Sequence, residues 1–162
     1  MQFIISLIIF GVITVGSVSE QNNKSKINTD EAEPIKESLL VSLERTPCFG
    51  MCPTYKYTIF NTGKVIYEGE ENVDNVGKYS AQLSKKQVSE IKDQINSANI
   101  FSLKDKYDTK ITDIPSTLLI INLDGKKKKI YDRHGAPEKL KNFEKYVDAI
   151  VLNSKMTKLQ DK

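Results

Sequence analysis

Two cysteines, Cys48 and Cys52, are the only thiols in a chain of 162 residues, and they lie four positions apart. Neighbouring thiols usually pair in an oxidising compartment. Gly50 between them permits the sharp bend that a short ring requires. A zinc site would need two more thiolate or imidazole ligands, and the sequence has a single histidine. We therefore expect a structural disulfide and no metal, with a thiol-redox pair as the alternative.

That histidine, His134, follows Asp132 by two positions. In a strand such residues point to the same side, so a carboxylate–imidazole couple is geometrically possible. A hydrolytic triad would also need an activated nucleophile, and the sequence has no Gly-x-Ser-x-Gly turn. We expect a surface histidine before the last helix and no catalytic residue, with hydrolysis at Asp132 and His134 as the alternative.

The longest predicted internal loop, residues 104–116, contains Thr112 and Asp113. Loops carry binding sites more often than cores do, although Asp113 could instead cap the turn into the next strand. Arg45, which lies close to the cysteines in the sequence, could supply a positive charge to a ligand or to a thiolate. Arg45, Thr112, Asp113 and His134 form our candidate ligand surface, with no cofactor expected.

The charges favour neither nucleic acid nor an acidic substrate. The 24 basic and 21 acidic side chains leave a net charge of +3, too small to attract a polyanion. Lys126–Lys129 are four consecutive lysines on a predicted strand, so two point to each face and no single basic groove forms. We interpret them as protection of an edge strand, with an anionic envelope polymer or lipid surface as the alternative partner.

Residues 1–19 carry no charged side chain, and an apolar run spans residues 3–15. Small residues follow it, so the segment is typical of a signal peptide cleaved before Glu20. The alternative is an uncleaved N-terminal anchor, although the run is short against the roughly 20 residues that cross a bilayer. We expect export to the periplasm or cell envelope, with membrane attachment only if the segment is retained.

The remaining chain divides into a polar linker, residues 20–38, a single domain, residues 39–151, and a polar tail, residues 152–162, that we expect to fray. Alternating polar and apolar residues predict strands, and spacings of three and four predict two helices. Ser84 and Gln87 have the spacing of a capping box at the first helix. The predicted strands cover residues 39–44, 55–60, 64–70, 72–83, 117–123 and 126–131.

The predicted fold is α+β, an antiparallel sheet of about six strands with two helices on one face, in the order ββββ-α-ββ-α. Packing both helices on one face would bury both apolar stripes. The consecutive apolar residues Leu118–Ile121 predict a central strand that is covered on both faces or nearly so.

The cysteine segment also carries a family resemblance. Its pattern, Arg-x-x-Cys-Phe-Gly-x-Cys-Pro-x-Tyr over residues 45–55, resembles an uncharacterised bacterial exported domain family of unknown function. The likeness extends over residues 41–151, through Gly63, Val65, Tyr67, Gly69, Phe101–Leu103, Thr112–Thr117 and Gly135–Pro137. The family implies an exported or lipid-anchored envelope protein but no activity. The N-terminal lipid-modified cysteine of many relatives is missing here.

Together these features favour a non-enzymatic binding or structural module of the bacterial envelope. We expect its partner to be another envelope protein, engaged through an exposed sheet face. The alternative is a thiol-redox or hydrolytic enzyme that uses Cys48 and Cys52, or Asp132 and His134.

Overall fold

The computed structural model describes residues 36–111 and 113–160. The expected signal peptide, nearly all of the expected linker and Thr112 lie outside these ranges. No helix within them combines the length and apolar character that spanning a bilayer requires.

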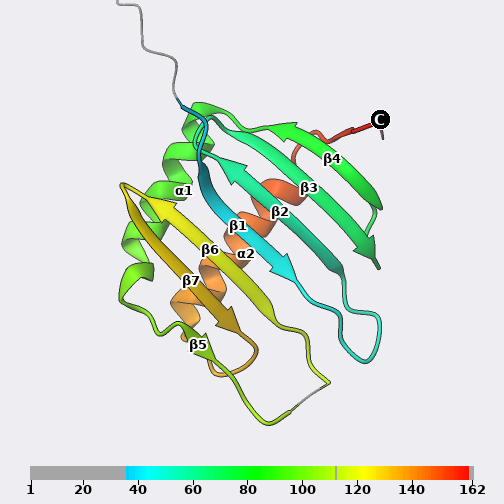
Figure 1. Ribbon diagram of the computed structural model, residues 1–162, viewed down its shortest axis with the longest axis vertical. Coiled ribbons are helices and arrows are strands. Elements are labelled where there is room, and N and C mark those ends of the chain that lie inside the picture. Colours follow the sequence, from blue (N-terminus) through cyan, green and yellow to red (C-terminus); the bar gives the residue numbers. More distant parts are fainter. Residues whose placement is uncertain (1–35, 112, 161–162) are drawn as a thin grey trace, which may run out of the picture. The chain divides into compact units, whose positions relative to one another are not determined.

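In the described part of the chain, two helices and eight strands form a mixed α+β domain with one open sheet (Figure 1). The sheet order is β5-β7-β6-β1-β2-β3-β4-β8. The elements are β1 (Leu39–Arg45), β2 (Thr54–Phe60), β3 (Lys64–Glu71), β4 (Gly77–Gln82), α1 (Lys85–Ser97), a short 3₁₀ helix (Ile100–Ser102), β5 (Lys106–Tyr107), β6 (Thr117–Leu123), β7 (Lys126–Asp132), α2 (Glu138–Leu152) and β8 (Thr157–Lys158).

The predicted strand count and order were wrong at two places. β5 and β8 add two short strands, and β5 pairs in parallel with β7, so the sheet is mixed and not purely antiparallel. β5 interrupts the expected loop 104–116, and β8 lies inside the expected frayed tail, where the amide of Leu159 also donates to the carbonyl of Lys78. Each strand has only two residues, too few for a periodic pattern.

Both helices cover the same face of the sheet (Figure 1). The capping box of Ser84 and Gln87 is present at the start of α1. The helices and the inward side chains of the central strands share one core, in which Leu43 of β1 lies between Tyr57 and Leu119. Fully burying an aliphatic side chain contributes about 1.5–3 kcal/mol. The buried helix residues are Val88, Ile91, Ile95, Leu140, Phe143, Glu144, Val147 and Val151.

No helix of the described residues covers the opposite face of the sheet (Figure 1), which corrects the expectation for β6. Leu119 and Ile121 are buried, whereas Ile120 is 37% exposed and Leu118 is only partly buried. The apolar run therefore has only one covered face, because both helices pack their apolar stripes against that same face of the sheet.

Gly69 in β3 is required by close packing of the chain. A Cβ atom there would overlap the carbonyl oxygen of Asn75 and come within 2.8 Å of the Tyr67 hydroxyl. Gly69→Ala should lower the free energy of unfolding by about 1–3 kcal/mol, the usual cost of overpacking. Gly50→Ala is the matched control, since its Cβ would meet only the Cys48 sulfur, at 3.8 Å. Urea denaturation of both variants tests this, and equal losses would contradict it.

Candidate functional site

The β1–β2 connection is closed by the expected disulfide between Cys48 and Cys52. Their Cα atoms are 5.7 Å apart, within the usual range for a disulfide. The base of this loop is anchored on both sides. The amide of Thr46 donates to the carbonyl of Ser116 at 2.9 Å, and the side chain of Asn72 donates to the carbonyl of Cys52 at 3.1 Å.

The tip of this loop presents two large apolar side chains to solvent. Phe49 is 93% exposed and Met51 is 88% exposed, the highest values among the exposed large apolar residues of the described chain. Glu71, opposite Thr54 in the sheet, and the neighbouring Glu70 and Asp74 are also exposed. The tip is therefore an apolar projection, and exposed carboxylates at the end of β3 lie next to the base of the loop.

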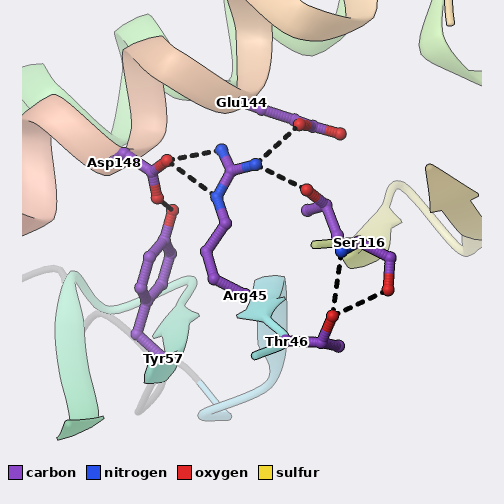
Figure 2. A network of polar contacts seen from close by, with 7 residues as sticks. Arg45, Thr46, Tyr57, Ser116, Glu144 and Asp148 are labelled. Carbon is purple, nitrogen blue, oxygen red and sulfur yellow. Dashed lines mark hydrogen bonds and ion pairs between the residues drawn. The ribbon is translucent and has the colours of Figure 1, made fainter. Parts of the chain in front are cut away.

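Behind the loop, Arg45 at the end of β1 forms the centre of a polar network with α2 (Figure 2). Its Nε and Nη2 donate to the same oxygen of Asp148, and its Nη1 donates to Glu144 at 3.2 Å and to the hydroxyl of Thr117. The hydroxyl of Tyr57 donates to the other oxygen of Asp148 at 3.0 Å. The guanidinium thus joins β1, β6 and α2.

Burial sets the electrostatics of this network. It raises the pKa of Glu144 to about 7 despite the charge of Arg45, and the nearby carboxylate of Asp132 raises it further. Burial also raises the pKa of Asp132 against the charges of Lys141, Arg45 and His134. For Arg45, burial disfavours the charge, but Asp148 and Glu144 outweigh it and raise the pKa. The two acids are therefore harder to ionise than ordinary surface carboxylates.

Two surface hollows meet at Arg45, Pro115 and Thr117. The first, about 330 Å³, reaches the disulfide loop and is also lined by Cys52, Pro53, Tyr55, Ser116 and Asp148. The second, about 200 Å³, lies toward the end of β7 and contains Asp132 and Glu144. Nowhere in residues 36–111 and 113–160 do three or more His, Cys, Asp or Glu side chains gather closely enough to hold a metal ion.

The predicted ligand residues have different environments. Arg45 lines both hollows, whereas Asp113 and His134 are exposed and line neither. Asp132 is buried although His134 is exposed. Thr112 lies outside the described residues.

Sequence reasoning missed Glu144, Asp148, Tyr57 and Thr117. One signal for Glu144 was present: it occupies the apolar stripe of α2 between Leu140 and Val147, where a charged residue is unexpected. A buried acid at such a position needs a cationic partner. Arg45 is that partner, but it is 99 residues away in the sequence.

Comparison with known proteins gives a family and no activity. No curated protein matches the chain. A family model described as "Domain of unknown function (DUF6438)" matches residues 39–151, which is more than half of the chain. The chain therefore belongs to the DUF6438 family of domains of unknown function.

Proposed function

We propose that this protein is an exported, non-enzymatic binding module that engages another envelope protein through the tip of its disulfide loop. The observation that carries this proposal is the exposure of Phe49 and Met51 on a covalently closed loop. Their exposure leaves apolar area in water, which a contact with a partner would remove. Aromatic and methionine side chains are enriched at protein interfaces.

The loop is a better candidate than the open face of the sheet. On that face the charges alternate across neighbouring strands, with Glu44 opposite Lys56, Lys56 opposite Glu68, and Glu68 opposite Lys78. Lys56 and Glu68 form an ion pair at 2.9 Å. Opposite charges therefore already face one another within the sheet, and a second protein would have to compete with the Lys56–Glu68 ion pair.

The disulfide contributes by limiting the loop's conformations before binding. A loop that is ordered in advance loses less entropy when it binds, which increases affinity without any new contact. The anchors at Thr46 and Asn72 act in the same way. The exposed acidic groups of Glu70, Glu71 and Asp74 favour a partner segment that has apolar side chains flanked by basic ones.

Photo-crosslinking in the producing cells tests this function. The full chain is made with p-benzoylphenylalanine in place of Phe49, and the control carries it in place of Ile120, which is 37% exposed on the sheet face. We expect a discrete adduct with another protein from position 49 and none from position 120. Equal labelling at both positions, or adducts formed only with a second copy of the chain, would contradict the proposal.

The captured partner then allows a measurement of affinity. Phe49→Ser and Met51→Ser should each weaken binding at least about tenfold, as expected of residues at the centre of an interface. Ile120→Ser should change it less than about twofold. The double variant Cys48→Ser, Cys52→Ser should bind several-fold more weakly, because its loop must be ordered on binding.

Export is supported by the sequence pattern of residues 1–19 and by the disulfide, which persists mainly outside reducing compartments. The intact mass of the protein from its native cells tests this part of the proposal. A chain that starts at Glu20 is expected. A chain that retains residues 1–19 in the membrane fraction would instead indicate the anchor, and a cytoplasmic location would contradict export.

A further inference from the structure

Residues that line the smaller hollow carry three of the four buried side-chain nitrogen and oxygen atoms that lack a hydrogen-bond partner in the described part of the protein. These three atoms are Asp132 Oδ1, Arg133 Nε and Glu144 Oε1. Buried polar groups in native proteins almost always have partners, so a cluster of exceptions calls for a physical explanation. A ligand that supplies the missing partners is such an explanation.

Asp132 and Glu144 carry the argument most strongly. They are 8% and 3% exposed, and each has one carboxylate oxygen without a donor. Figure 2 shows that the second oxygen of Glu144 points away from Arg45. The other oxygen of Glu144 is already used by Arg45. The unmet requirement is therefore for hydrogen-bond donors at two neighbouring carboxylates.

The charges around the hollow restrict the chemistry of the ligand. Four cationic and two anionic side chains line it: Arg45, Arg133, Lys141, Lys145, Asp132 and Glu144. The balance of +2 disfavours a bare metal ion or a simple amine. A simple anion would satisfy Arg133 and the lysines but would leave the two carboxylate oxygens without donors. A ligand with both a cationic donor and an anionic acceptor meets both requirements.

The volume of the hollow favours a small ligand. Its volume, about 200 Å³, is below the roughly 300–1,000 Å³ of sites for drug-sized molecules. Lys141 and Lys145 line the hollow, and their side chains are partly buried and exposed, respectively.

From these observations we infer that the hollow between β6, β7 and α2 binds a small zwitterion of the α-amino-acid type. Its ammonium group donates to Asp132 and Glu144, and its carboxylate accepts from Arg133 Nε and the neighbouring lysines. This site is separate from the loop tip of Phe49 and Met51, so it does not depend on the proposed protein partner.

Titration of the isotope-labelled full chain, followed by amide chemical shifts, tests the inference. The probes are the common α-amino acids in both enantiomers, with ethylamine and propionate as the two halves of alanine. We expect at least one amino acid to give saturable shifts at the ends of β6 and β7 and in α2, while ethylamine and propionate give none. Binding of propionate alone, of ethylamine alone, or of no probe would overturn the inference.

Three variants locate the binding groups. Asp132→Asn and Glu144→Gln keep the shape of the side chains but remove the charge that receives the ammonium, and each should weaken binding at least about tenfold. Lys139→Gln, on an exposed part of α2 outside the hollow, should leave the affinity unchanged. The amide spectrum of each variant shows whether it is folded. Unchanged affinity in both folded acid variants would overturn the site, whereas failure of the Phe49 experiment would not affect it.

Discussion

Arg45→Met should lower the free energy of unfolding at pH 8 by about 3–5 kcal/mol, the usual cost of removing one partner from a buried ion pair. The side chain of Arg45 is 23% exposed, and those of Glu144 and Asp148 are 4% and 14% exposed. Without the guanidinium, two carboxylates remain largely shielded from water and close to each other. Tyr57 still donates to Asp148, but Glu144 loses its cation.

Urea denaturation at pH 8 measures this loss, and the same measurement at pH 5 tests whether the charge of Glu144 causes it. The deficit should be smaller at pH 5, because Glu144 without Arg45 is readily protonated there. Arg133→Met is the matched control, since Arg133 has a similar exposure, 26%, but its contacts are weaker: a long ion pair of 3.8 Å with Asp108 and a cation–π contact with Tyr131. It should cost at most about 1 kcal/mol. A loss below about 1 kcal/mol for Arg45→Met at pH 8 would show that solvent screens the network.

Glu144 should make the protein less stable as pH rises from about 4.5 to 7. Its ordinary pKa is 4.5 and its folded pKa is about 7, so in this window the folded state binds more protons than the unfolded state. The stabilisation is therefore complete below about pH 4.5 and is lost as pH rises through 7. At about 1.36 kcal/mol for each pH unit, the loss is about 3 kcal/mol.

The raised pKa of Asp132 acts in the same direction. The lowered pKa values of Glu68 and Asp108, caused first by hydrogen bonds from Lys56 and Lys106, act in the opposite direction and only at more acidic pH. Glu144→Gln should remove most of the decline between pH 5 and 8, as measured by urea denaturation. Glu138→Gln, on an exposed position of the same helix, should retain it. A full decline in the Glu144 variant would assign the effect to another group.

Much of the framework was predictable because it depends on local signals. The capping box of Ser84 and Gln87 acts over a few residues, and the apolar periods show which side of each long element is buried. The disulfide followed from two thiols four positions apart. The fourth strand was predicted too long, because Asn72 has a positive φ of 56° and β4 begins only at Gly77.

The site was less predictable because its residues come from distant parts of the chain. Arg45 was a candidate only through its proximity to the cysteines, and neither Glu144 nor Asp148 was linked to it. Asp113 and His134 were candidates by residue type, yet they line neither hollow. Residue type does not show which oxygen has a partner or how far a side chain is buried.

The sequence alone determined the class of fold, the start of the first helix and the covalent closure of the loop. All of these depend on neighbouring residues or on simple periodicity. The tertiary structure decided the register that brings Arg45 beside Thr117, the position of α2 over that strand end, and the exposure of Phe49 and Met51. Those outcomes depend on packing between segments up to about a hundred residues apart. A charge or an aromatic ring becomes buried or exposed only when those segments pack together.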